Sequence, residues 1–192
     1  GKYLNEYPFN KPKFIPPGWT DWHSFHDQPN GGATYYDYEM NDNGKLHEYG
    51  RKPKDYSTDV IANRAKQFIH EEAGGKKPLF MYVTPYGPHA NRIPAPRHKG
   101  MFRNTPVNLG PEFYEKDRSE KASQYNSGPA PKAKVAKEHT REAYRTIQSL
   151  DDAVIGIRKQ LKKEGQLKNT SFMYMSDQGY SMGQHHWTGK MS

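Results

Sequence analysis

The sequence has no cysteine among its 192 residues, which excludes disulfide bonds, thiolate metal sites and a cysteine nucleophile within the chain. It also has no apolar run of membrane-spanning length, and Gly1-Lys2-Tyr3 resembles neither an initiating methionine nor a signal peptide. Apolar residues are scarce, at 33%, whereas Gly and Pro number 17 and 15. We therefore expect long loops around a small core, as one domain or as part of a larger fold.

Acidic residues are in the minority, because 29 Lys and Arg face 21 Asp and Glu, a net charge of +8. This surplus favours an anionic partner, such as nucleic acid, a membrane surface or a sulfated or phosphorylated substrate. The sequence contains no RNA-binding aromatic signature, zinc-finger spacing or basic heptad. We therefore expect no nucleic-acid partner.

Local patterns predict a structured loop, a hairpin and two helices. Residues 1–33 are rich in Pro, Gly, Trp and His and predict a structured loop. Two short strands, 35–40 and 45–49, flank an Asn-Gly turn and predict a hairpin. Apolar residues at helical spacing predict helices over about 59–72 and 134–164.

Two short apolar runs, 79–83 and 171–176, predict buried strands. A long connection with a helix lies between them, so they form a βαβ-type unit with parallel strands in an α/β sheet. Residues 87–131 read as a loop crowded with Pro, Gly and Asn. A loop of this length either builds a site or is a poorly packed surface excursion.

Polar side chains follow both predicted strands at the edge where parallel sheets bind ligands. His89 comes six residues after the first strand, and Asp177 directly follows the second. Asp177 and Gln178 offer a carboxylate and an amide oxygen, which suit Ca²⁺ or Mg²⁺. The alternative is an Asp-x-Gly turn in which the side chain bonds only its own backbone.

Two adjacent histidines, His185 and His186, precede Lys190. Zinc is not expected there, because neighbouring histidines point apart and no partner stands at finger spacing. A histidine that donates to an oxyanion, with Lys190 as a fixed positive charge, suits a sulfate or phosphate ester. The alternative is a polar loop.

Four further residues lie in loops, and each of them alone is more often a surface residue than a ligand: Lys2, His23, His26 and His98. Asp151 and Asp152 are expected on a solvated helix face; the alternative is that one of them faces the core edge and caps a neighbouring loop.

Several motifs in this order and spacing resemble the sulfatase family of the alkaline phosphatase-like superfamily, in particular its N-acetylglucosamine-6-sulfatase and arylsulfatase-like branch. The matching segments are Gly1 to Asn5, Ile15 to Trp22, Tyr82 to His89, Ile147 to Asp152 and Ser176 to His185. The resemblance covers nearly the whole chain and is vaguest over 103–133. It implies an α/β fold: part of an alkaline phosphatase-like sheet with flanking helices, incomplete at the N-terminus. Residues 1–192 would then be a partial catalytic domain.

The resemblance also implies hydrolysis of a sulfate ester by a formylglycine hydrate nucleophile, made from Cys or Ser, beside a bound Ca²⁺. Asp177 and Gln178 would be metal ligands. The residues in contact with the sulfate or the nucleophile would be Lys2, His89 and Lys190. His185 would lie on the substrate or leaving-group side. A cation and several positively charged donors would stabilise charge on the transferring sulfuryl group.

Three features depart from the family pattern. Family members usually carry Asp-Asn-Gly where this chain has Asp177-Gln178-Gly179, and many carry a histidine where Leu4 stands, with Asn5 as a partial substitute. The Cys/Ser-x-Pro-x-Arg formylglycine motif is absent from the sequence. We therefore expect a fragment that lacks its nucleophile and is inactive by itself.

Two other functions stay open: a non-catalytic polyanion-binding protein that keeps the sulfatase fold, and a phosphoesterase of the same superfamily. The resemblance implies a sulfated small molecule or glycan as partner and a secreted or lysosomal location. Asn169-Thr170-Ser171 is an N-glycosylation sequence that matters only in a secreted protein. No oligomeric state is predicted.

Overall fold

The structure, a computed structural model, describes residues 1–4, 7, 10–26, 33–121, 123 and 131–190. The chain divides into two compact units. The first consists of residues 1–99 and 146–170, and the second of residues 100–145 and 171–192. The long helix α3 (Ala133–Lys163) supplies residues to both.

The first unit contains a three-stranded antiparallel sheet in the order β1-β2-β3. Its strands are β1 (His23–Phe25), β2 (Tyr38–Asp42) and β3 (Lys45–Tyr49). Asn43 and Gly44 form the hairpin turn with φ of 51° and 85°, the left-handed values that an Asn-Gly turn favours. The predicted hairpin is therefore confirmed, but β1 lies in the segment predicted to be loop.

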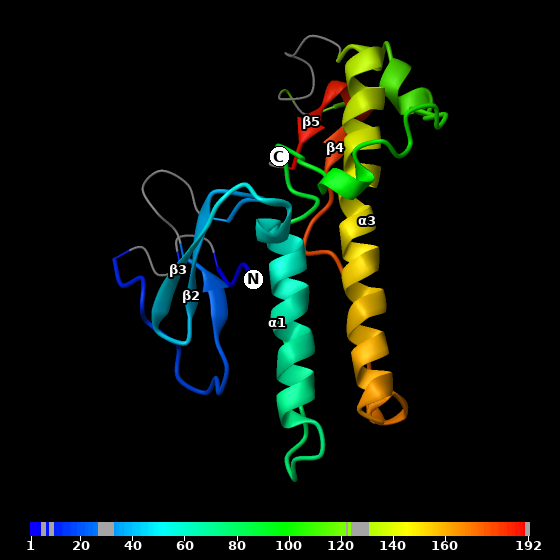
Figure 1. The fold of residues 1–192 in the computed structure, drawn as a ribbon. Helices are drawn as coiled ribbons and strands as arrows, with labels where there is room; N and C mark the ends of the chain where they lie inside the picture. Colours follow the sequence, from blue (N-terminus) through cyan, green and yellow to red (C-terminus); the bar gives the residue numbers. More distant parts are fainter. Residues whose placement is uncertain (5–6, 8–9, 27–32, 122, 124–130, 191–192) are drawn as a thin grey trace. The chain divides into compact units, whose positions relative to one another are not determined.

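Helix α1 (Ser57–Glu72) buries one face against this sheet (Figure 1). Val60 and Ile61 pack with Phe25 and Met40 of the strands. Further along, Ala65 and Ile69 pack with Ile157 and Leu161 of α3. Both predicted helices are confirmed to within two residues, because their apolar positions recur at the 3.6-residue period.

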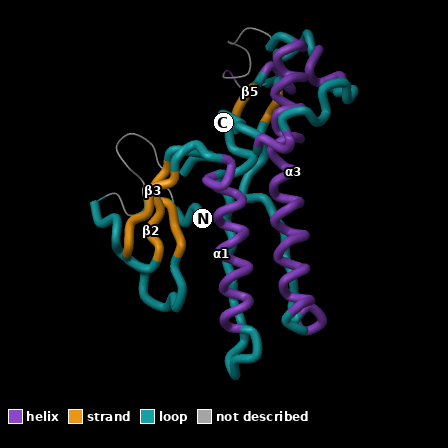
Figure 2. The backbone as a smooth tube through the Cα atoms, viewed as in Figure 1, coloured by secondary structure: helices purple, strands orange, loops and turns teal. Residues whose placement is uncertain are grey.

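The second unit has little regular structure besides the first part of α3 (Figure 2). A short hairpin pairs β4 (Ser181–Met182) with β5 (Thr188–Gly189). The small core of this unit contains Val107, Leu109, Phe113 and Ala136.

Residues 87–121, which belong partly to each unit, contain only two short 3₁₀ turns, Pro96–His98 and Pro111–Tyr114. This agrees with the predicted loop.

The two predicted buried strands are not formed. Residues 79–83 and 171–176 pair with no strand in the described part of the chain. Their side chains are largely exposed, with Phe80 at 76% and Met173 at 84%. The apolar composition was read correctly, but a strand needs a hydrogen-bonded neighbour, and both described sheets are antiparallel and built from other segments.

No helix among the described residues is both long enough and apolar enough to cross a membrane.

Candidate functional site

His89 is held at its ring and at its backbone by two tyrosines of the first unit. The Tyr86 hydroxyl lies 2.7 Å from His89 Nδ1 and donates to the Ala90 carbonyl at 3.1 Å. The Tyr35 hydroxyl donates to the His89 carbonyl at 2.7 Å. Nδ1 also contacts the Ala90 carbonyl. These contacts fix the orientation of the imidazole.

The two tyrosines belong to a packed aromatic group. The rings of Tyr35 and Tyr56 stack with centroids 5.9 Å apart, and Tyr35 meets Tyr86 edge-on at 5.1 Å. Burial raises the pKa of Tyr56 to about 12, and it also raises the pKa of Tyr35 and of Tyr86. All three therefore stay protonated at neutral pH, and their hydroxyls remain donors to the His89 loop, including Tyr56 to the Ile93 carbonyl.

A second set of contacts holds Arg97 and His98, which lie further along the loop that carries His89. Arg97 forms a bidentate ion pair with Asp59 of α1 at 2.6 and 2.7 Å and donates to Asp152 of α3 at 2.8 Å. His98 also contacts Asp152, at 2.9 Å. Burial works to raise the pKa of Asp152, but the hydrogen bonds from Arg97 and His98 outweigh it and lower the pKa. The Asp152 side chain is 46% exposed, as predicted for a solvated helix face, and it also joins this loop to α3.

Lys2 lies beside the strand-like segment that leads to His89. Its backbone N–H donates to the Thr84 carbonyl at 2.9 Å. A Cβ at position 1 would stand 2.1 Å from that carbonyl oxygen, so only glycine permits the approach. Lys2 and His89 thus lie on the same unit. The Lys2 backbone is hydrogen-bonded to Thr84, which precedes His89 by five residues. Asn5 lies outside the described residues.

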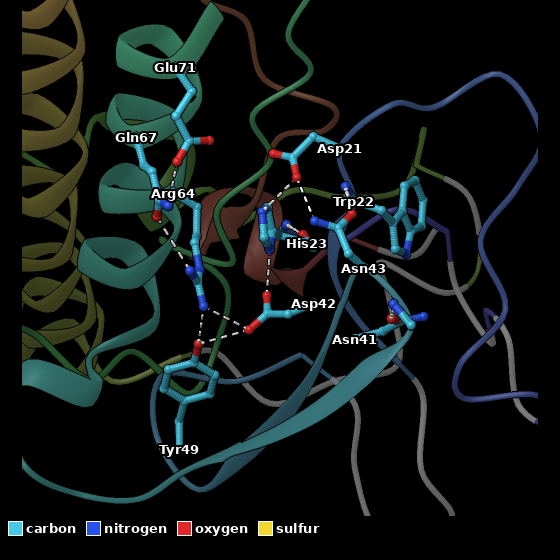
Figure 3. Close-up of polar contacts among 12 residues, drawn as sticks. Asp21, Trp22, His23, Asn41, Asp42, Asn43, Tyr49, Arg64, Gln67 and Glu71 are labelled. Carbon is cyan, nitrogen blue, oxygen red and sulfur yellow. Dashed lines mark hydrogen bonds and ion pairs between the residues drawn. The ribbon is translucent and has the colours of Figure 1, made fainter.

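Asp42 stands at the centre of a further polar cluster in this unit (Figure 3). His23 Nδ1 lies 2.5 Å from one carboxylate oxygen, while Arg64 at 2.9 Å and the Tyr49 hydroxyl at 3.2 Å donate to the other. Burial opposes ionisation, but His23 and Arg64 prevail and lower the Asp42 pKa. His23 and Arg64 also line a cavity of about 100 Å³, which neither Lys2 nor His89 lines. We interpret this cluster as a polar contact that joins the three-stranded sheet to α1.

Two of the isolated histidines are buried, which corrects the prediction that they are surface residues. His26 contacts Glu39 of β2, and His98 contacts Asp152. Each imidazole forms a hydrogen bond with a neighbouring carboxylate, and this bond replaces the hydrogen bonds to water that are lost on burial.

Asp177 and Gln178 lie in an exposed loop of the second unit. The Ser176 hydroxyl closes this loop by donating to the Gln178 carbonyl at 2.5 Å. Within the described part of the chain, the Asp177 side chain makes no hydrogen bond or ion pair, so the turn does not depend on it. The alternative of a carboxylate that only bonds its own backbone therefore has no support from this geometry.

His185 is fixed by a residue that the sequence did not suggest. Its Nδ1 lies 2.6 Å from Glu115 Oε2. The hydrogen bond with His185 lowers the Glu115 pKa, so the carboxylate is charged at neutral pH. His185 has a left-handed φ of 51°, and Gly183 before it packs so closely on Phe113 that a Cβ would stand 2.4 Å from the ring. Non-glycine residues adopt such φ values mainly where the surroundings impose them.

Lys190 is exposed at the end of β5. The second unit thus carries Asp177, Gln178, His185 and Lys190 on the short β4–β5 hairpin and the loop that leads into it. No group of three or more His, Asp or Glu side chains suited to a metal ion occurs among the described residues. Asp177 and Gln178 have the hard oxygen donors that Ca²⁺ prefers, but they are two of the six to eight that it takes.

Comparison with known proteins gives the family of this chain. The sulfatase family model matches residues 10–191. The chain therefore belongs to the sulfatase family, and the resemblance drawn from its motifs is confirmed.

Individual relatives agree with this assignment. The chain is 32% identical to the extracellular sulfatase SULF-1 homolog of Drosophila melanogaster, over 96% of this chain and 16% of that protein. It is 31% identical to human N-acetylglucosamine-6-sulfatase, over 96% of this chain and 34% of that protein. The chain thus spans about a third or less of the length of these relatives.

A structure solved in complex with its substrate, D-glucosamine-2-N,6-O-disulfate, superposes with a TM-score of 0.67 at 23% identity. The match covers 91% of this chain and 47% of that one. At this identity the likeness concerns the fold, and the predicted α/β class is confirmed.

Proposed function

We propose that the full-length protein that carries this chain hydrolyses sulfate esters of sugars. The observation that carries the proposal is the match of the sulfatase family model over residues 10–191. The names of the relatives and the sulfated glucosamine bound by the structural neighbour support a sugar as the substrate. Residues 1–192 would form part of the catalytic domain, in a secreted or lysosomal protein.

Positively charged and hydrogen-bonding side chains would bind the sulfate. Lys2 and Lys190 would neutralise its oxygens, and His89 would donate to one of them, or to the nucleophile, in the orientation set by Tyr86. Such preorganised donors lower the barrier because they match the charge that develops on the transferring group. The nucleophile would be a formylglycine hydrate from outside this sequence, which has no Cys/Ser-x-Pro-x-Arg motif.

His185 would serve the leaving group. Its Nδ1 faces Glu115, so its Nε2 would carry the proton given to the ester oxygen as the sulfur–oxygen bond breaks. The contact between Nδ1 and Glu115 Oε2 would orient the ring and leave Nε2 for the ester oxygen. The sugar then leaves as a neutral alcohol.

Asp177 and Gln178 would hold a Ca²⁺ ion with further ligands from other parts of the full-length protein. Both supply oxygen donors, as the ion requires, and Asp177 has no competing partner in the described residues. A bound cation would supply positive charge beside the sulfate oxygens. Gln178 replaces the usual asparagine with one extra methylene, so we expect its substitution to affect the metal less than that of Asp177.

Hydrolysis of 4-nitrophenyl sulfate and of glucosamine 6-sulfate by the full-length protein tests the proposal. Asp177→Ala should lower kcat/KM at least about 100-fold, which added Ca²⁺ partly restores. Glu120→Ala removes another exposed carboxylate of the same unit and should leave the rate unchanged. Wild-type activity in Asp177→Ala would refute the metal-ligand role. A full-length protein that cleaves neither ester but binds sulfated glycans would instead be the non-catalytic polyanion-binding alternative.

A further inference from the structure

The C-terminal ends of α1 and α3 carry a dense group of exposed cations. Ala65 and Ile69 of α1 pack with Ile157 and Leu161 of α3, so the helices end together (Figure 1). His70 of α1 contacts Glu164 at 2.9 Å and joins the two ends. We call this group the basic end; it consists of Lys76, Lys77, Arg158, Lys159, Lys162, Lys163 and Lys168.

Four of these cations cover the outer face of the last turns of α3. With Ile157 and Leu161 buried, the 100° step per residue puts positions 158, 159, 162 and 163 on the opposite side. Five steps of 1.5 Å place the four within about 7.5 Å along the axis. That span is about one Debye length at physiological salt, so their potentials add.

The described residues of this chain do not neutralise the basic end. Its seven cations form no ion pair with any described residue, and the same two segments, 70–78 and 158–169, contain only three carboxylates. Glu164 already accepts hydrogen bonds from His70 and Gln160, and Glu71 accepts one from Gln67. Positive charges at i and i+4, as in Arg158 with Lys162, destabilise a helix.

The helix dipole explains only part of this pattern. It favours Lys162 and Lys163 in the last turn of α3. The effect does not extend to Arg158 and Lys159 one turn earlier, or to Lys76 and Lys77 on the neighbouring loop. The grouping therefore lowers the stability of the helix, and no ion pair among the described residues compensates for this. A surface that binds a polyanion would show the same pattern.

We propose that the basic end is a binding surface for a linear sulfated polysaccharide, separate from the ester site. This inference rests on the proposed function, since it assigns to that substrate class a second contact beyond the hydrolysed sulfate. A chain with many sulfates would gain affinity from both contacts, because the second one is intramolecular once the first has formed.

Charge alone would also attract nucleic acid, but the side chains favour a polysaccharide. Proteins that bind single strands interleave cations with aromatic rings on which the bases stack. Segments 70–77 and 158–169 contain no Phe, Tyr or Trp. The surface thus offers charge without stacking, which suits sulfate groups on sugar rings.

The test compares heparin binding by the full-length protein with that of a variant in which Arg158, Lys159, Lys162 and Lys163 are all changed to Gln. Glutamine keeps helix propensity while it removes the charge. The dissociation constant for heparin at 0.15 M salt should rise at least about tenfold, and the steep loss of affinity with salt should become shallower, as counterion release predicts. Hydrolysis of 4-nitrophenyl sulfate should be unchanged.

A matched variant changes Lys11, Lys13, Lys45 and Lys54 to Gln, four exposed lysines of the same unit outside the basic end. It loses the same charge, and we expect less than a twofold change in heparin binding. Equal losses in the two variants, no loss in the first, or tighter binding of single-stranded RNA than of heparin would overturn the proposal. Failure to cleave 4-nitrophenyl sulfate, with heparin binding lost only in the first variant, would refute the sulfatase function and retain the surface.

Discussion

His89 and His185 are each held at Nδ1, but by surroundings of opposite character. His89 lies on a loop anchored by buried tyrosines, of which Tyr35 is 1% exposed. His185 lies on a short hairpin and is held by Glu115, a surface carboxylate that also faces Lys121 at 3.5 Å. The first histidine is therefore positioned by neutral donors within a core, and the second by charge. Mutations should expose this difference as a loss of stability in one region and a loss of rate in the other.

The largest expected effect is on the core beneath His89. Tyr35→Ala removes a buried ring that packs on Tyr56 and Tyr86, and should lower the free energy of unfolding by about 3–5 kcal/mol. Denaturant titration measures the change. Tyr114→Ala, at a residue 61% exposed, should cost about 1 kcal/mol or less. Equal losses would contradict the anchoring role of Tyr35.

Glu115→Gln should act on rate instead. Loss of the charge beside His185 should lower kcat of the full-length protein about tenfold with little change in KM, because proton donation to the leaving group weakens. The pH–rate profile should change, and Glu115→Asp should recover part of the rate. Glu120→Gln is the control. The unfolding free energy should stay close to that of the wild type. An unaltered kcat and profile would contradict the pairing of Glu115 with His185 in catalysis.

Tyr86→Phe separates orientation from packing at His89. The ring stays in place, but the hydroxyl that contacts Nδ1 is lost. The loss of this hydrogen bond should destabilise the transition state by about 1 kcal/mol and thereby lower kcat/KM a few-fold. Tyr49→Phe also removes a partly buried hydroxyl of the first unit, but one bound to Asp42, and should leave the rate unchanged. The same rate loss in both variants would assign the effect to general stability.

The smallest effect concerns pH. The lowered pKa of Asp152 means that the folded state favours its ionised form, so its contribution is present above the unfolded value of about 3.9 and fades as pH falls through the lower folded value. Asp152→Asn should cost about 1 kcal/mol or less at pH 7, since the side chain is 46% exposed, and progressively less as pH falls below the unfolded value. Asp151→Asn, at the neighbouring carboxylate that contacts Gln148, is the matched control. Urea titrations between pH 2 and 7 measure the difference.

Local patterns in the sequence predicted much of the fold. The Asn-Gly turn and the 3.6-residue periodicity specified the hairpin and both helices, because each depends on neighbours in sequence. Strand β1 was missed since three residues, His23 to Phe25, carry no readable alternation. Segments 79–83 and 171–176 have strand-like composition, but pairing depends on other segments and cannot be read from composition.

The candidate site was predictable to the same degree. Motifs indicated His89, Asp177 and His185, while their supporting residues came from the structure. Glu115 lies 70 positions from His185, and Tyr35 lies 54 from His89, and no local signal joins such pairs. Tyr86 alone stands within a quoted motif, three residues before the histidine that it orients.

The exposed run 171–176 gives the chain two built-in chemical reporters. Met173 and Met175 are 84% and 76% exposed, and thioethers in such positions react readily with peroxide to give sulfoxides. The same run is an aggregation hazard for this chain in isolation, because uncovered apolar segments associate. Mass-spectrometric counting of sulfoxides, in the isolated chain and in the full-length protein, would therefore measure how much of this surface the remainder of the protein shields.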